Sequence, residues 1–198
     1  MTDKLKKQLD FLIEIDKMKT IFRQTLLMDQ SRQENDAEHS WHFAMMAMTL
    51  FEYANSPLVD LNHVIKMALV HDLIEIYAGD TFAYDRVGYQ DKEKREKDSA
   101  DQLFDLLPTE QNIEFRSLWE EFEAMETPDA IYAAAIDRLQ PFLSNYKTNG
   151  HTWALHKVAS NQVYQRMDVV KYALPELWNF VEDVICDSIE KGYIVEQK

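Results

Sequence analysis

The sequence is poor in the residues that form turns and cross-links: its 198 residues include only four Gly, five Pro and one Cys. So few Gly and Pro argue against a turn-rich β fold and favour helices. The one cysteine, Cys186, cannot form a disulfide within the chain, which suits a reducing, cytoplasmic compartment. No apolar run approaches the ~20 residues that a membrane-spanning helix needs. The first residues lead into an amphipathic helix, so we expect no signal peptide.

Positive charge is also scarce. The chain has 21 Lys and Arg against 35 Asp and Glu, which gives a formal net charge of −14. Nucleic acid polymers and anionic membranes need a basic face, so we exclude both as partners. A small anionic substrate remains compatible with this charge, because a metal ion and one or two basic side chains can hold one phosphate inside an acidic protein.

What the sequence does contain is apolar residues at helical spacing over most of its length. With 46% apolar residues, a chain of this size can bury a full core, and one domain over residues 1–198 is expected. We therefore predict an all-α helical bundle. The predicted helices comprise residues 4–19, 35–50, 61–77, 91–107 and 110–125, one starting at 128, and one or two long helices over 151–190 with a break near Pro175. Residues 20–34 and 78–90 are predicted loops.

The stretch from His71 to Asp80 carries four polar groups at the end of a strongly apolar helix. His71 and Glu75 are four residues apart and Asp72 and Glu75 three apart, so on a helix they overlook one surface. Gly79 suits the left-handed residue that ends a helix, which places Asp80 at the mouth of that surface. Buried polar groups are costly unless something pairs with them. A divalent metal ion would pair with these, since imidazole and carboxylate are ordinary ligands for it.

Further ligands must come from other helices, because one adjacent His-Asp pair cannot surround an ion. His39 continues the apolar stripe of its helix and points inward. Asp137 follows a face of small residues, which lets a neighbouring helix approach, and Pro141 predicts a kink beside it. With His71 and Asp72 they form a set that suits Mn²⁺, Co²⁺, Fe²⁺ or Zn²⁺ and leaves positions for water and substrate. Each residue alone is also explained as a polar group satisfied in the core; four together favour a metal.

The order of these residues resembles the H…HD…D pattern of the HD-domain metal-dependent phosphohydrolases, which are single HD-type helical bundles. The local sequences are similar to the branch containing the bacterial 5′-deoxynucleotidases and HD-domain-containing protein 2. They are Glu38-His39-Ser40, His71-Asp72-x-x-Glu75, Gly79-Asp80 and Ala135-Ile136-Asp137-Arg138-Leu139. The resemblance covers a core of about residues 20–145, which the C-terminal helices would close.

The resemblance implies a role for each matching residue. The four candidate ligands, His39, His71, Asp72 and Asp137, would bind one divalent metal ion. Glu75 would stay free of the metal and orient or deprotonate the attacking water. Arg23 would hold the phosphate, for which its fork-shaped cation is suited, and Asp80 would lie beside the sugar of a nucleotide. In the deoxynucleotidases a tryptophan follows that arginine; here Gln24 follows, which leaves the preference for deoxyribose open.

We therefore predict a phosphomonoesterase that releases phosphate from (deoxy)nucleoside 5′-monophosphates, with a homodimer as the expected assembly. No Gly-rich phosphate loop and no nucleophile arrangement stands out, so direct attack by water is the simplest course. Four alternatives remain: another small phosphate ester, ppGpp hydrolysis, a di-iron oxygenase, and a non-catalytic protein that binds metal or nucleotide. The oxygenase would need further histidines between Asp72 and Asp137, and the sequence has none there.

Overall fold

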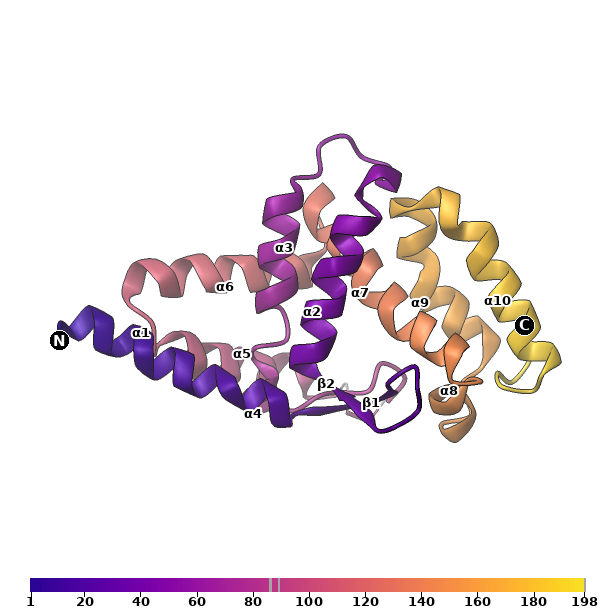
Figure 1. The fold of residues 1–198 in the computed structure, drawn as a ribbon, viewed down its shortest axis with the longest axis horizontal. Helices are drawn as coiled ribbons and strands as arrows, with labels where there is room; N and C mark the ends of the chain where they lie inside the picture. The colour runs from indigo at the N-terminus through magenta and orange to yellow at the C-terminus, as the bar shows by residue number, and fades with distance from the viewer. Residues whose placement is uncertain (86, 89, 198) are drawn as a thin grey trace.

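The computed structural model describes residues 1–85, 87–88 and 90–197, and within these ranges the chain is mostly helical with one small sheet (Figure 1), in agreement with the predicted all-α class. The helices are α1 (Asp3–Glu14), α2 (Asp36–Thr49), α3 (Leu61–Val70), α4 (Glu75–Ala78), α5 (Lys92–Phe104), α6 (Thr109–Ala124), α7 (Pro128–Lys147), α8 (His151–Leu155), α9 (Ser160–Ala173) and α10 (Trp178–Glu190). Short 3-10 helices are η1 (Ile15–Thr20), η2 (Phe51–Tyr53) and η3 (Pro175–Leu177). Among the described residues, no helix is long and apolar enough to cross a membrane.

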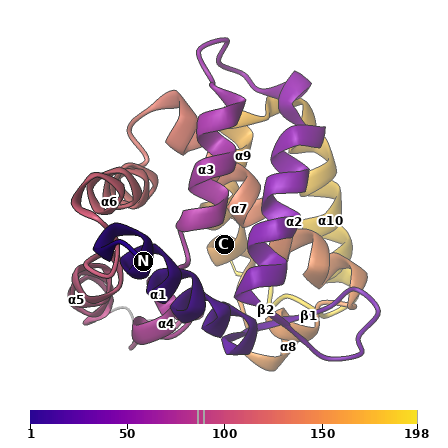
Figure 2. The same cartoon turned by 60° about the vertical axis from the view of Figure 1, so that its left-hand side comes forward.

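Three helices, α2, α3 and α7, form the centre of the molecule. In Figures 1 and 2, α1, α5 and α6 lie on one side of them, and α9 and α10 lie on the other. The N- and C-termini are at opposite ends of the longest axis (Figure 1). The buried apolar side chains form one continuous cluster from Phe11 to Ile194, so both flanking groups pack on the same core.

The central helices α2, α3 and α7 each begin with a capping side chain. The Asn35 side chain accepts a hydrogen bond from the Glu38 N–H at 3.0 Å, and the Glu38 carboxylate accepts one from the Asn35 N–H at 3.2 Å. Asp60 caps α3 through the Asn62 N–H, and Thr127 caps α7. Each such cap stabilises its helix by about 1 kcal/mol. These caps fix where α2, α3 and α7 begin, and therefore the position of each side chain along its helix axis.

Residues 20–34, predicted as a loop, contain strands instead. Strand β1 (Phe22–Leu26) pairs antiparallel with β2 (Gln33–Asn35). The strands are short and show no clean alternation of buried and exposed residues, so their sequence carries little strand signal. Part of their support comes from outside the hairpin, because the Thr152 hydroxyl of α8 donates to the Gln24 carbonyl of β1 at 3.1 Å.

The helix predicted over 61–77 breaks at His71. Helix α3 ends at Val70, residues 71–74 form turns, and α4 begins at Glu75. In the turns, the Leu73 N–H donates to the Val70 carbonyl, three residues back rather than four. The tighter winding begins after His71, whose own N–H still donates to the Met67 carbonyl four residues back, and Gly79 then ends α4 with φ 75°, as expected.

The helix predicted over 4–19 is also divided, and its leucine face is exposed. Helix α1 ends at Glu14 and η1 continues to Thr20. Leu12 and Ile13 are 58% and 71% exposed, and the residue that α1 buries is Phe11. Apolar spacing identifies a common face but does not say whether another element covers it.

The other helices agree with prediction within a few residues, except toward the C-terminus. The break near Pro175 is present as η3, but a second break between Leu155 and Ser160 separates α8 from α9. There Lys157 has φ 52°, a left-handed conformation that its sequence does not announce. Helix α7 continues across Pro141 to Lys147.

Candidate metal centre

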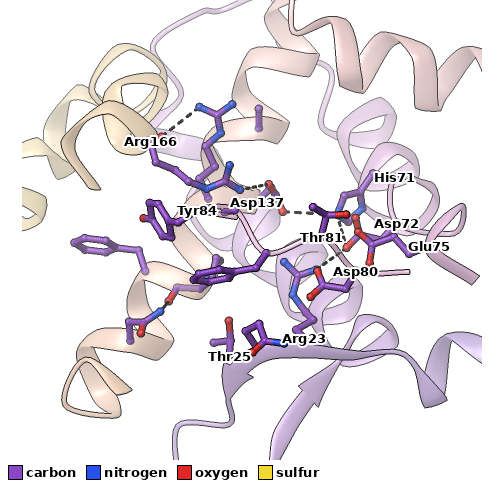
Figure 3. A pocket seen from close by; sticks show the side chains of 18 of the residues that line it. Arg23, Thr25, His71, Asp72, Glu75, Asp80, Thr81, Tyr84, Asp137 and Arg166 are labelled. Carbon is purple, nitrogen blue, oxygen red and sulfur yellow. Dashed lines mark hydrogen bonds and ion pairs between the residues drawn. The ribbon is translucent and has the colours of Figure 1, made fainter. Parts of the chain in front are cut away.

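Four side chains from three separate segments converge at the centre of the bundle, and Figure 3 shows three of them, His71, Asp72 and Asp137. His39 comes from the first turn of α2, His71 and Asp72 from the turns after α3, and Asp137 from the middle of α7. Ligand atoms of His39, His71 and Asp72 all lie within 4.8 Å of one another. Asp137 Oδ1 lies 3.0 Å from His39 Nε2 and 3.7 Å from His71 Nε2. The structure thus brings together all four of the ligands predicted from the sequence.

The donor set fits a divalent metal ion. His39 is fully buried, and Asp72 and Asp137 are nearly so. Asp72 Oδ2 lies 3.1 Å from His71 Nε2, yet this nitrogen is buried without a hydrogen-bond partner among the described residues. A buried imidazole lone pair that faces two carboxylates is unfavourable unless a proton or a cation lies between them. Two imidazoles and two carboxylates are ordinary ligands of a mid-hardness divalent ion.

Hydrogen bonds behind the two histidines aim their Nε2 atoms at the centre. His71 Nδ1 lies 3.0 Å from the Ala68 carbonyl. His39 Nδ1 lies 2.9 Å from Gln140 Oε1, and Gln140 Nε2 donates to the buried Glu34 carboxylate at 2.7 Å. Both Nδ1 atoms face acceptors, so a proton on each Nδ1 would leave the Nε2 lone pair for a cation. The sequence analysis missed Gln140, although its place one turn after Asp137 on α7 is a usable signal.

A group of carboxylates lies beside the centre. Asp36, Asp72 and Glu75 offer oxygens within 4.8 Å of one another. Burial and the neighbouring charges of Asp72 and Asp36 raise the pKa of Glu75 well above its ordinary value. Burial, together with the charge of Asp72, raises the pKa of Asp36 to about 7. The sequence analysis missed Asp36, because an acid in the first turn of a helix has an ordinary explanation in the helix dipole.

Arg23 reaches this acidic group from β1. Its Nη1 lies 2.8 Å from Asp72 Oδ2 and 3.6 Å from Asp36 Oδ1, and 13% of its side chain is exposed. Burial alone would lower the pKa of the guanidinium, but Asp72 and the other carboxylates around it raise the pKa overall. Arg23 is therefore a fixed positive charge at the edge of the centre.

The centre opens into a cavity of about 260 Å³. His71, Asp72, Glu75 and Asp137 line its floor, and Arg23 and Asp80 line its sides. Asp80 follows α4, as predicted, and burial raises its pKa. The candidate ligands therefore face a space that can admit a small molecule.

Three comparisons place the chain among known proteins. A family model described as HD domain matches residues 15–178. A crystal structure of a predicted metal-dependent phosphohydrolase from Magnetospirillum magnetotacticum MS-1 superposes with a TM-score of 0.92 at 46% identity, covering 97% of this chain and 96% of that one. The chain therefore belongs to the HD domain family, a family of metal-dependent phosphohydrolases.

Curated relatives are more distant. The 5′-deoxynucleotidase HDDC2 of Homo sapiens is 26% identical over 153 residues, which is 77% of this chain and 72% of that protein. The 5′-deoxynucleotidase HDDC2 of Danio rerio is 32% identical over 114 residues, 58% of this chain. The match covers 55% of the Danio rerio protein, so this chain spans about half of that protein's length.

Proposed function

We propose that this phosphohydrolase is a phosphomonoesterase that releases phosphate from nucleoside 5′-monophosphates. The observation that carries the proposal is the meeting of His39 and Asp137 with the adjacent pair His71 and Asp72, of which all but His39 line one cavity. The names of the curated relatives support a nucleotide as the substrate.

The four converging residues are the proposed ligands of one divalent ion, with Mn²⁺, Co²⁺, Fe²⁺ and Zn²⁺ as candidates. When bound, such an ion polarises a phosphoryl oxygen and lowers the pKa of coordinated water. Glu75 is proposed to accept the proton of the attacking water. It is buried at the cavity floor beside Asp72, and its raised pKa makes it a stronger proton acceptor than an ordinary carboxylate. The water oxygen bonds to phosphorus as the bond from phosphorus to the nucleoside oxygen breaks.

The sides of the cavity are proposed to hold the nucleotide. Arg23 would donate to the phosphate oxygens, because a guanidinium fork matches the spacing of phosphate oxygens. Asp80 would lie beside the sugar, and Gln24, which lines the same cavity, would face it in place of the tryptophan of related deoxynucleotidases. A ribonucleotide is therefore admitted alongside a deoxyribonucleotide in this proposal.

The variant Glu75→Gln tests this assignment. A panel of nucleoside monophosphates is incubated with Mn²⁺- or Co²⁺-loaded protein, and released phosphate and bound metal are both measured. We expect the variant to keep its metal and to lose about 10²–10⁴-fold in turnover, the usual contribution of a positioned general base. The exposed Glu110→Gln serves as the control and should match the wild type. Unchanged turnover would remove Glu75 from its role, and metal binding without phosphate release from any ester would favour a non-catalytic protein.

The assembly and setting of the enzyme belong to the same proposal. We propose that residues 1–198 act as one domain, which the continuous buried core supports. A homodimer is proposed because large apolar side chains such as Trp41 and Tyr172 are more than half exposed. A cytoplasmic setting is proposed because Cys186, the one cysteine, is a free thiol.

A further inference from the structure

We propose that Arg166 of α9 is a second phosphate-binding residue, opposite Arg23, and that the pair selects dianionic phosphate monoesters over diesters. This inference rests on the proposed function, because it concerns the substrate of the same cavity. It assigns a role to α9, which supplies none of the proposed metal ligands.

The two arginines occupy equivalent positions on either side of the centre. Arg23 Nη1 pairs with Asp72 Oδ2 at 2.8 Å, and Arg166 Nη2 lies 3.8 Å from Asp137 Oδ2. Figure 3 shows Asp137 between Arg166 on one side and His71 on the other, with Arg23 close to Asp72. Each carboxylate of the candidate ligand set thus has a guanidinium on its outer side.

The guanidinium of Arg166 has N–H groups that can donate hydrogen bonds to a ligand. Asp137 uses Oδ1 toward the histidines and Oδ2 toward Arg166. A separation of 3.8 Å permits an ion pair but is too long for a hydrogen bond. Because a guanidinium carries five N–H donors, donors remain for a ligand in the cavity that Arg166 lines.

The position of Arg166 is fixed by its backbone and its neighbour. Arg138 Nη1 donates to the Arg166 carbonyl at 3.2 Å, which ties α9 to α7 directly beside Asp137. The next residue, Met167, is 2% exposed and belongs to the core. The side chain of Arg166 is itself only 26% exposed, so it is directed along the cavity wall rather than into bulk solvent.

The two guanidinium groups that flank the floor of the cavity indicate which class of phosphate ester binds there. A phosphate monoester dianion has three non-bridging oxygens, and a diester monoanion has two. An ion at the floor together with donors from Arg23 and Arg166 can engage three oxygens at once. A diester would leave one set of donors without a partner and would place its second alcohol group against a charged wall, which is unfavourable.

A purely structural role for Arg166 makes a different prediction. If the arginine only orients Asp137, its loss should weaken metal binding and should leave phosphate binding unchanged once metal is saturating. If it binds phosphate, metal content should persist while phosphate affinity falls.

The test is a calorimetric titration of inorganic phosphate into three Mn²⁺-loaded proteins: the wild type, Arg166→Gln and Arg166→Lys. Bound metal is measured in each sample. We expect Arg166→Gln to weaken phosphate binding by about 10- to 100-fold, as for loss of a hydrogen bond to a charged group. Arg166→Lys keeps the charge without the fork and should recover part of the loss. Arg116→Gln, whose arginine pairs with Asp101 away from the cavity, is the matched control and should equal the wild type. Thermal unfolding confirms that each variant is folded.

Kinetics with p-nitrophenyl phosphate and bis(p-nitrophenyl) phosphate complete the test. Arg166→Gln should raise KM for the monoester much more than it lowers kcat, and should narrow the preference for monoester over diester. Equal phosphate affinity in wild type and Arg166→Gln would overturn the inference, as would a loss of affinity that saturating metal restores. If the wild type binds phosphate through Arg166 but hydrolyses no nucleotide, the proposed function fails while this inference stands.

Discussion

The floor and the walls of the cavity are built in different ways. The candidate metal ligands come from α2, from the turns after α3 and from α7, at the centre of the core, and all but His39 line the cavity floor. Much of the walls comes from β1, from residues 80–84 and from α9, that is, from a hairpin, a loop and an outer helix, and the rest comes from α5, α6, α7 and α8. Packing fixes the floor, whereas individual hydrogen bonds fix much of the walls.

This difference separates metal binding from substrate binding. A carboxylate or imidazole on a packed helix can be held in one geometry by the core. A side chain on a loop depends on a few polar contacts and on the order of the loop itself. Changes to the candidate metal ligands should therefore act on metal affinity, and changes to the walls should act on KM with metal retained.

The largest effect is expected for Asp137→Asn on the floor. The substitution keeps the shape of the side chain but removes the charge that faces His39 and His71. Metal affinity should fall by more than about 100-fold, beyond the usual cost of losing an outer-shell partner, and activity should fall with it. Calorimetric titration of Mn²⁺ measures this, with the exposed Asp183→Asn as control. Retained metal affinity would show that Asp137 is not a ligand.

A smaller effect on metal is expected for Gln140→Leu. The variant removes the acceptor that fixes the His39 ring and the donor to Glu34. Outer-shell losses of this kind cost about 10- to 100-fold in metal affinity. The same titration checks it, with the exposed Gln165→Leu as control. An unchanged affinity would mean that packing alone orients the His39 ring.

On the wall, Arg95→Lys should raise KM and leave metal affinity unchanged. Arg95 donates to the Ala78 carbonyl at 2.6 Å, to Thr81 Oγ1 at 3.1 Å and to the Gly88 carbonyl at 3.0 Å, so it fastens the loop that carries Asp80. A lysine cannot make these three hydrogen bonds together, and each lost hydrogen bond costs about 1 kcal/mol. We expect KM to rise by up to about tenfold, measured against Arg116→Lys. A drop in metal affinity instead would contradict the separation of wall from floor.

Sequence reasoning recovers the floor better than the walls for a physical reason. His39, His71 and Asp137 interrupt apolar or small-residue faces of helices, and periodicity reveals which way such a face points. Arg23 is predicted only through the family resemblance, and Arg166 is not predicted at all. Neither arginine interrupts a periodic apolar face that would indicate which way its side chain points. The break at His71 was missed because the apolar run crosses it without a Gly or Pro.

Other errors share one cause, which is that local sequence does not encode what lies opposite. The leucine face of α1 is periodic but uncovered, with Leu12 at 58% exposure. The β1–β2 hairpin has weak strand character and gains support from Thr152 across the fold. Asp36 has an ordinary explanation as a first-turn acid, and only its neighbours Asp72 and Glu75 reveal its place beside the centre.

The smallest effect is expected where α6 contacts α3 and the start of α7. There Glu121 of α6 accepts a hydrogen bond from the Thr127 hydroxyl at 2.6 Å and lies 2.8 Å from His63 Nε2 of α3. Burial opposes ionisation, but the hydrogen bonds from Thr127 and His63 lower the pKa of Glu121 below its ordinary 4.5. Because the folded state holds this proton less tightly than the unfolded state, its stabilisation is complete above the unfolded pKa and disappears as pH falls through the folded one. Glu121→Gln should therefore cost about 1 kcal/mol of unfolding free energy at pH 7 and progressively less below pH of about 4. Urea unfolding of both proteins across this range measures the difference, and a cost that stays constant with pH would mean that packing, not the carboxylate charge, joins α6 to the floor.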